Sequence, residues 1–378
     1  MIGPVLHRYG FELVQEPLRL RNLVEHQCQK QGQPLPAEEV WGPAQEGWLL
    51  GWPGRGSAAY LERYRQLRSR LIRNLGGNLE GWLDFLPSPT AMPTPRTEVE
   101  VGQGPGCQPN LAEGLARLGW GGHLVLDQHP QMLPPLVEGE IHISGGDQEK
   151  TLIEMGQARW PQGWLRLQDL ELTGDLVVSG GLVELHRCCL RPGASLEVSG
   201  AGAILVLDES DIYGEVEAQA GTLLQASNCN FEGSAVGLES TGLVRLQGVA
   251  FSQHAQAALL LRERARAMLE DCQLRESGFG LRASGQARVW LSQSWLRGNA
   301  QCGLLADDDT DLEIQACHFR NNGGDGLWLR GRSRVQLRIS FIQDNGTAGV
   351  RVSDQVSLEQ AGNQATGNPQ GDWLEARN

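Results

Sequence analysis

The densest group of side chains with catalytic chemistry in this sequence is a run of three aspartates. Asp307, Asp308 and Asp309 follow a short apolar segment at a point where the chain is expected to turn. Adjacent carboxylates can bind calcium or act as a general acid and base. They can equally be solvated turn residues that pair with nearby arginines. The sequence leaves both interpretations open, so these aspartates are weak catalytic candidates.

A second group of candidates recurs at a constant interval of 23 residues. Its members follow a glycine in successive copies of a repeat, and they are Arg282, Leu305, Trp328 and Arg351, with Arg330 two residues beyond Trp328. An indole can stack on a sugar ring or a cation, and a guanidinium binds a carboxylate with two hydrogen bonds. We therefore expect Arg282, Trp328, Arg330 and Arg351 to bind an anionic sugar.

Histidines near residue 130 are candidates for a metal site. His123, Asp127, His129 and His142 carry the imidazole and carboxylate groups that zinc and copper prefer. His123 and His129 are six residues apart in an extended segment, about 20 Å, which is too far for one ion. We therefore predict neither a metal site nor a cofactor.

The interval of 23 residues belongs to an internal repeat. Four asparagines keep this step at the end of the chain: Asn299, Asn322, Asn345 and Asn368. Weaker copies precede them at intervals of 18 to 23 residues, and within each copy polar and apolar residues alternate. Alternation predicts strands, and strands this short need a copy of themselves beside them. The repeat therefore predicts stacked coils, with the asparagines in a column where they hydrogen-bond as a ladder.

The segment Asn322-Gly-Gly-Asp-Gly326-Leu327 resembles the right-handed parallel β-helix repeats of the pectin-lyase-like superfamily. More narrowly it is similar to the carbohydrate-binding and sugar-hydrolase type of β-helix domain, found in alginate epimerases and F-box proteins. The resemblance covers residues 98–378. It implies a mainly β fold, a right-handed parallel β-helix of about a dozen coils, and a sugar site on the face that carries Trp328. The polygalacturonase motifs N-T-D, G-H-G and R-I-K and the epimerase motif D-P-H-D are absent from the sequence.

The residues before the repeat have a different pattern. We predict a small helical domain at 1–86, a proline-rich linker at 87–97, and the β-helix at 98–378, with a capping helix near 110–118 that begins at an Asn110/Glu113 capping box. Residues 57–75 read as an amphipathic helix, whose apolar face carries Tyr60, Leu61, Tyr64, Leu67, Leu71 and Ile72 and whose other face is rich in arginine. That helix could bind an acidic partner or phosphates, be solvated, or dock on the acidic β-helix.

An apolar stripe is expected on the outside of the coils. Trp295, His318 and Phe341 occupy equivalent outward positions in successive repeats. Such a stripe can be a partner surface, a self-association surface, the docking place of the helical domain, or an ordinary exposed face. Cys229, Cys272 and Cys317 fall at inward positions, where we expect buried thiols and no nucleophile.

Composition excludes several classes of partner. The net charge of −13 argues against nucleic acid as the main partner. We expect no membrane association, because no apolar run approaches the roughly 18–20 residues that span a bilayer. The eight cysteines form no C-x-x-C pair and no export signal is visible, so we expect free thiols and a cytoplasmic location.

These observations favour a non-catalytic β-helix module, a scaffold that recognises a protein partner or a glycan. The alternative is a carbohydrate-active enzyme, a polysaccharide lyase, hydrolase or epimerase, acting on an anionic sugar along the β-helix face. A structural fibre is a third possibility, and a homo-oligomer is compatible with each of them.

Overall fold

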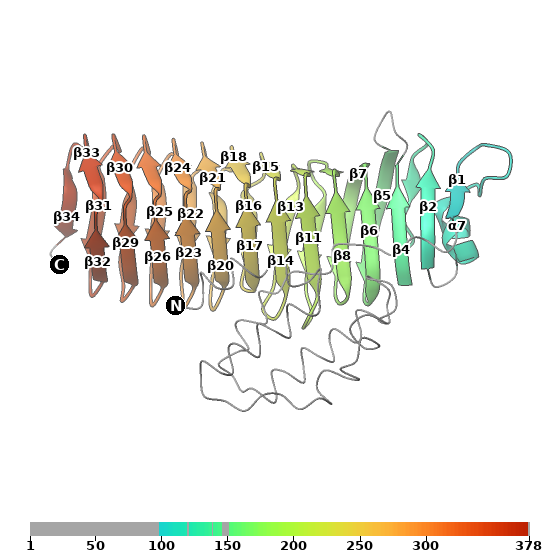
Figure 1. Cartoon of the computed structure of the whole chain (residues 1–378), viewed down its shortest axis with the longest axis horizontal. Coiled ribbons are helices and arrows are strands. Elements are labelled where there is room, and N and C mark those ends of the chain that lie inside the picture. Colours follow the sequence, from blue (N-terminus) through green and yellow to red (C-terminus); the bar gives the residue numbers. More distant parts are fainter. Residues whose placement is uncertain (1–97, 119–120, 138, 146–150, 377–378) are drawn as a thin grey trace, which may run out of the picture.

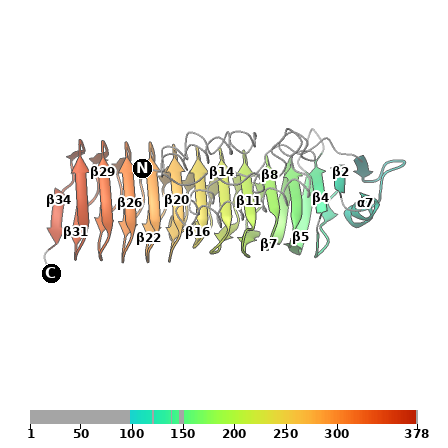
Figure 2. The same cartoon turned by 60° about the horizontal axis from the view of Figure 1, so that its bottom comes forward.

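The structure is a computed structural model that describes residues 98–118, 121–137, 139–145 and 151–376. The helical domain predicted at 1–86 and the linker at 87–97 lie outside the described residues. The strands stack side by side along one axis, with β1 at one end and β34 at the other (Figures 1 and 2). The described residues thus form a parallel β-solenoid, which confirms the predicted mainly β fold.

One side of the solenoid is a 13-stranded parallel sheet, called sheet A. Its strands, in spatial order, are β1 (Glu98–Val101), β2 (Gly121–Leu126), β4 (Gly139–Ser144), β6 (Gly163–Gln168), β8 (Leu182–His186), β11 (Ile204–Asp208), β14 (Leu223–Ser227), β17 (Leu243–Gln247), β20 (Arg266–Glu270), β23 (Arg288–Ser292), β26 (Asp311–Gln315), β29 (Arg334–Arg338) and β32 (Ser357–Ala361).

Two further ladders of parallel strands complete each coil. Ladder B holds the short strands β9 (Cys189–Leu190), β12 (Asp211–Ile212), β15 (Asn230–Glu232), β18 (Ala250–Ser252), β21 (Gln273–Arg275), β24 (Trp295–Arg297), β27 (His318–Arg320), β30 (Phe341–Gln343) and β33 (Gln364–Thr366). Ladder C holds β3 (Gln131–Met132), β5 (Thr151–Trp160), β7 (Leu170–Val178), β10 (Ser195–Val198), β13 (Glu215–Ala218), β16 (Val236–Ser240), β19 (Ala257–Leu261), β22 (Phe279–Ala283), β25 (Cys302–Ala306), β28 (Leu327–Leu329), β31 (Ala348–Ser353) and β34 (Gly371–Ala376). The long strand β7 pairs with both β9 and β10, so it contributes to both ladders.

A tight bend links sheet A to ladder B in each coil. Gln293, Ala316 and Ile339 occupy this bend with φ of 52°, 54° and 52°, the left-handed region. Each is followed by a buried residue that starts the next inward row. A single left-handed residue costs roughly 1–3 kcal/mol when it is not glycine, so the pairing of the coils on both sides must hold these residues in place.

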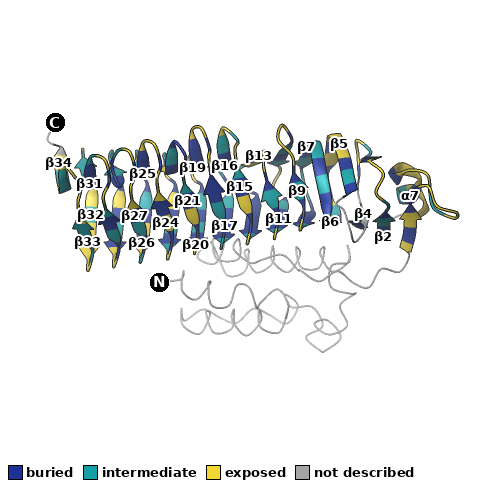
Figure 3. Cartoon of the chain, turned by 90° about the horizontal axis from the view of Figure 1, so that it is seen from above, coloured by how far each residue is buried: buried dark blue, intermediate teal, exposed yellow. Residues whose placement is uncertain are grey.

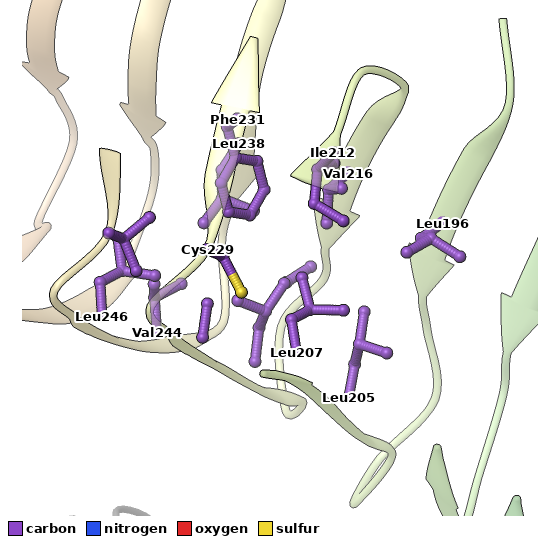
Figure 4. Packing of buried hydrophobic residues seen from close by; sticks show 14 of the residues in the cluster. Leu196, Leu205, Leu207, Ile212, Val216, Cys229, Phe231, Leu238, Val244 and Leu246 are labelled. Atoms are coloured by element: carbon purple, nitrogen blue, oxygen red, sulfur yellow. The ribbon is translucent and has the colours of Figure 1, made fainter. Parts of the chain in front are cut away.

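The interior of the coils is filled by stacked apolar side chains. Figure 4 shows this packing around Leu205, Leu207 and Phe231, which are fully or almost fully buried. Phe231 stacks on Phe251 of the next coil with ring centroids 4.7 Å apart. Cys229 is buried among these side chains, and burial raises the pKa of its thiol to about 12. The inward cysteines therefore serve packing, since the thiolate is the nucleophilic form.

The four repeat asparagines form a hydrogen-bonded ladder inside the last coils. Asn299 donates from its backbone N–H (3.1 Å) and from Nδ2 (3.0 Å) to Oδ1 of Asn322. Asn322 makes the same two contacts to Asn345, and Asn345 makes them to Asn368. Each Nδ2 also donates to a backbone carbonyl of ladder B, such as that of Leu296. The ladder provides hydrogen-bond partners for backbone groups at a buried turn, where pairing between strands supplies none.

A short helix covers the end of the solenoid near β1. It is α7 (Leu111–Leu118), and it contacts β1, β2 and β3. Asn110 caps it: the backbone N–H of Glu113 donates to Asn110 Oδ1 (2.9 Å), and Asn110 Nδ2 donates to Glu113 Oε1 (3.1 Å). Gly114 lies so close to Val101 that a Cβ there would meet Cγ2 at 2.8 Å. The cap thus removes the first coil's apolar interior from water. No helix in the described part of the chain is long and apolar enough to cross a membrane.

The outer face of sheet A differs between its two halves (Figure 3). In β23, β26 and β29 buried residues alternate with more exposed ones, as expected for a face in contact with water. In β8, β11 and β14 inward and outward residues alike are mostly buried. One outward residue there is Glu184, which is 6% exposed and accepts a hydrogen bond from Trp164 Nε1 at 2.9 Å.

We predict that Asn322→Ala lowers the free energy of unfolding by about 1–3 kcal/mol, because it leaves buried donors of Asn299 without an acceptor. The matched control is Asn230→Ala on exposed ladder B, where a change within about 0.5 kcal/mol is expected. Denaturant unfolding measures both variants, and equal losses would contradict a stabilising role for the ladder.

We predict that Glu184→Gln removes a pH dependence of stability. Burial raises the pKa of Glu184 from 4.5 to about 8, so the folded protein favours the neutral carboxyl. The neutral Glu184 carboxyl contributes fully to folding stability below pH 4.5. This contribution is lost as the pH rises through 8, where the buried carboxyl must ionise. Thermal midpoints measured across this range should fall more steeply for the wild type than for the variant, and parallel curves would contradict the prediction.

Candidate functional site

The three aspartates do not converge on one point. Asp307 pairs with Arg330, and Asp309 pairs with Nε of Arg332 at 2.7 Å. Asp308 accepts the backbone N–H of Gly285 at 2.9 Å. Each carboxylate therefore has its own partner in a neighbouring coil. Within the described residues no group of three or more His, Cys, Asp and Glu side chains has the geometry of a metal site.

The predicted ligand-binding residues form a column on ladder C. Arg282 pairs in register with Leu305, Leu305 with Trp328, and Trp328 with Arg351. Leu305 is buried between them, so Arg282 is separated from the rest of the column. The guanidinium of Arg330 lies over the Trp328 ring, 5.0 Å from its centroid. The geometry brings Trp328 and Arg330 together, and their assignment as ligand-binding residues stays a prediction.

Arg351 is engaged by a buried carboxylate. Its Nε donates to Asp325 Oδ2 at 2.7 Å and its second terminal nitrogen to Oδ1 at 3.1 Å. Asp325 also accepts the backbone N–H of Ala348 at 2.9 Å and the hydroxyl of Thr347. Burial acts to raise the pKa of Asp325, and these hydrogen bonds outweigh it, so the pKa lies below its usual value. Arg351 therefore contributes to the fold of the last coils.

The apolar stripe on ladder B is a stack of three rings. Trp295 and His318 are parallel with centroids 3.9 Å apart, and His318 and Phe341 follow at 4.9 Å. Trp295 is 37% exposed, so one side of the stack faces water. Burial and the neighbouring Arg320 lower the pKa of His318, which keeps the ring neutral and apolar.

The histidines near residue 130 form two separate pairs. His123 stacks on His142 with centroids 4.2 Å apart, whereas His129 Nδ1 lies 2.8 Å from Asp127 Oδ2. His123 also bridges Ser144 Oγ (2.8 Å) and Glu98 Oε2 (3.3 Å), the order of a nucleophile, a base and an orienting acid. The backbone N–H of Gly145 beside Ser144 donates to a carbonyl of β6 (3.0 Å), so it offers no oxyanion donor. We interpret the network as structural.

A concave basic surface lies elsewhere, on the outer side of sheet A. We call it the arginine groove; it has a volume of about 550 Å³ and is lined by Arg264, Arg266, Gln286, Arg288, Asp309, Asp311, Arg332 and Arg334. Among the residues that the structure describes, only Arg332 of the five arginines forms an ion pair, with Asp309. Arg266 and Arg288 are direct neighbours in the parallel pairing of β20 and β23.

Like charges placed side by side on a sheet destabilise it. The arginine groove therefore concentrates positive charge on a chain whose net charge is −13. This charge density is a local basic patch of the kind that binds anions. Sequence reasoning selected Asp309 of its lining but missed the arginines. The sequence contained a signal for this groove, because Arg288 and Arg334 are two repeat steps apart and so occupy equivalent positions of the repeat.

A second shallow pocket continues the arginine groove along sheet A. Its lining includes Met268, Trp290, Glu270 and Glu313. Trp290 Nε1 donates to Glu313 Oε2 at 3.0 Å, which fixes the orientation of the indole. An apolar ring surface thus lies next to the arginines on the same strands.

Comparison with known proteins agrees with this architecture. Residues 217–378 match the family model described as "Right handed beta helix region". The described chain folds as a right-handed parallel β-helix. This confirms the fold that the repeat predicted.

Solved structures of similar fold include the A-module of the Azotobacter vinelandii mannuronan C-5 epimerase AlgE6. It has 12% sequence identity and a TM-score of 0.50, and the match covers 70% of this β-helix protein and 93% of that chain. The A-module of AlgE4 from the same organism matches with 13% identity and a TM-score of 0.33, over 70% and 89% of the two chains. The catalytic domain of a GH87 alpha-1,3-glucanase matches with 9% identity and a TM-score of 0.30, over 77% and 70%. A search of the curated proteins finds no significant match.

We predict that Asp325→Asn lowers the free energy of unfolding by roughly 1–3 kcal/mol, since it leaves the Arg351 guanidinium without its buried charge partner. Asp309→Asn is the matched control, because its ion pair with Arg332 is exposed and contributes about 0–1 kcal/mol. Equal unfolding midpoints for the two variants would show that Arg351 is not held by Asp325.

Proposed function

We propose that this β-helix binds a linear acidic glycan along the outer face of sheet A and does not turn it over. The observation that carries the proposal is the arginine groove, in which four of the five arginines form no ion pair with any residue that the structure describes. A polyanion would relieve the repulsion among these arginines, and a guanidinium binds a carboxylate with two hydrogen bonds.

The spacing of the arginines suits an extended ligand. Neighbouring strands of sheet A are about 4.8 Å apart. Arg266 and Arg288 lie on neighbouring strands, and Arg334 lies two strands beyond Arg288. A chain that runs along the solenoid axis would therefore meet Arg266, Arg288 and Arg334 in turn, with Asp311 between the last two.

The indole of Trp290 supports a sugar as the repeating unit. It lies on the same strands as the arginines, and its contact with Glu313 holds it in place. Aromatic side chains present an apolar face of the size of a sugar ring next to polar groups that orient it. The solved structure with a TM-score of 0.50 is named as an enzyme of mannuronan, which supports a role connected with carbohydrate.

The chemistry of the arginine groove favours binding over catalysis. Its lining residues include no histidine, tyrosine, lysine or cysteine among the residues described. Arginine stays protonated in proteins, so it cannot exchange a proton with a substrate at neutral pH. Asp307, Asp308 and Asp309 are turned to separate partners, so these three aspartates do not converge on one point.

A protein partner is the second candidate, and the aromatic stack on ladder B favours it. Trp295, His318 and Phe341 present flat apolar rings on an otherwise polar face. Aromatic anchors of this kind are enriched in protein interfaces, including those of homo-oligomers.

The deciding experiment measures binding of mannuronan, polygalacturonate, a neutral glucan and duplex DNA by calorimetry. The test variant is Arg288→Ser with Arg334→Ser. The matched control is Arg297→Ser with Arg320→Ser, which removes the same charge from ladder B. We expect the test variant to weaken binding of the acidic glycans by roughly tenfold or more per arginine, because a hydrogen bond to a charged group contributes about 1.5–3 kcal/mol.

Three results would contradict the proposal. Equal weakening in the control would place the ligand on ladder B. Equal binding of duplex DNA would show attraction to any polyanion. New reducing ends, unsaturated products or changed sugar configuration, lost in the test variant, would establish an enzyme.

A further inference from the structure

The charges of the arginine groove follow a definite order along the solenoid axis. Strands β20, β23, β26 and β29 lie side by side (Figure 1), and the residues that start them form the first outward column of sheet A. From β20 to β29 this column carries Arg266, Arg288, Asp311 and Arg334. The positive charge is therefore interrupted once, at β26.

The turns that precede these strands repeat the interruption. They supply Arg264, Gln286, Asp309 and Arg332 to the lining of the groove. Neighbouring turns are in contact, since Arg264 Nε donates to Gln286 Oε1 at 3.3 Å and Arg332 Nε lies 2.7 Å from Asp309 Oδ1. The coil of β26 thus contributes only carboxylates to the groove, whereas the coils on either side contribute arginines. Along the axis the groove is basic, then acidic, then basic again.

Asp311 keeps its carboxylate available to a ligand. Asp309 is already paired with Arg332. Asp311 forms no ion pair with any residue that the structure describes, although Arg288 and Arg334 are its direct neighbours on the sheet. A carboxylate accepts hydrogen bonds and repels a second carboxylate. The part of a ligand that lies over Asp311 should therefore donate hydrogen bonds and carry no negative charge.

The next outward column places an apolar ring beside this position. It carries Trp290 on β23 and Glu313 on β26, and Glu313 orients the indole by accepting the Trp290 Nε1–H. Asp311 and Glu313 are two positions apart on one strand, so they project from the same face about 7 Å apart. An apolar ring and two hydrogen-bond acceptors therefore lie next to one another. This combination suits an uncharged sugar, whose hydroxyls donate and whose ring carbons contact the indole.

The spacing of the positive charges matches sugars on either side of that position. Arg288 and Arg334 are two strand spacings apart, about 9.6 Å, with Asp311 between them. A linear glycan extended along the axis places roughly one sugar ring over each strand, because a pyranose ring and the strand spacing of about 4.8 Å are of similar size. Arg266 is a direct neighbour of Arg288, so the two can share one carboxylate. Two acidic sugars, over β23 and β29, would thus be separated by one sugar over β26.

We propose that the arginine groove binds a glycan whose acidic sugars are separated by uncharged ones, and that Asp311 determines this specificity by excluding a carboxylate between them. Arg288 and Arg334 bind the two carboxylates, and Asp311 accepts a hydroxyl or amide N–H of the uncharged sugar beside Trp290. The inference rests on the proposed function, because it names the class of acidic glycan that the same groove takes.

Calorimetric binding of two synthetic oligomannuronates of equal length tests the inference. One is acidic on every sugar. In the other, every second carboxyl is reduced to a hydroxymethyl group, which leaves the linkage and the ring configuration unchanged. Charge attraction alone would make the fully acidic oligosaccharide bind more tightly. We expect the wild type to bind the alternating oligosaccharide at least as tightly, because no carboxylate then has to lie over Asp311.

The variant Asp311→Asn isolates the role of this residue. The amide keeps the size of the side chain and one acceptor oxygen, and it removes the charge. We expect the variant to bind the fully acidic oligosaccharide roughly threefold to tenfold more tightly than the wild type does, because the repulsion at this position is lost. Its affinity for the alternating oligosaccharide should change by less than about twofold, since the amide oxygen still accepts a hydrogen bond.

The matched control is Glu217→Gln, which removes the same charge from an exposed position on ladder C. It should leave the ratio of the two affinities unchanged, because Glu217 does not line the groove. A thermal unfolding transition should show that Asp311→Asn folds as the wild type does.

An unchanged ratio of the two affinities in Asp311→Asn would overturn the inference while leaving glycan binding in place. A shift of that ratio in Glu217→Gln as large as in Asp311→Asn would overturn it as well, since the effect would then come from net charge. If neither oligosaccharide binds to the wild type, the proposed function fails and this inference fails with it.

Discussion

Everything in this structure depends on the parallel pairing of each coil with the next. A strand of three to five residues has too few contacts to persist alone, so its backbone groups must be satisfied by the equivalent strand one coil away. The register is continuous through β20, β23, β26 and β29, in which each residue meets its counterpart 22 or 23 positions later. The fold is therefore a chain of nearest-neighbour contacts.

This pairing turns each position of the repeat into a column of side chains about 4.8 Å apart. Inside the coils a column of like residues is favourable, as in the ladder of Asn299 to Asn368 and the stack of Phe231 on Phe251. Outside the coils the same geometry can be unfavourable, because it places Arg266 against Arg288. A surface column of like charges is the place where a bound ligand of opposite charge can stabilise the protein most.

Sheet A brings two kinds of surface onto one set of strands. Over β6 to β17 its first outward column is apolar and largely buried, and from β20 onward the same column carries Arg266, Arg288, Asp311 and Arg334. A flat sheet can support both because outward side chains are not constrained by packing inside the coils. The inward rows can stay apolar along the whole length while the outward rows vary from coil to coil.

The sequence by itself determined the side-chain positions that recur at a short interval along the chain. The alternation of inward and outward residues, the 23-residue step of Asn322 and the capping box of Asn110 with Glu113 depend on neighbours in the chain or on one repeat step, and so they could be read directly. Only the tertiary structure decided what each outward residue meets. It showed that Arg351 is engaged by Asp325, that Asp307 and Asp309 turn to different arginines, and that Arg264, Arg288 and Arg334 line one groove. The physical reason is that the 23-residue step determines which outward residues become neighbours, whereas the direction of each side chain and the conformation of the turns determine which neighbours pair.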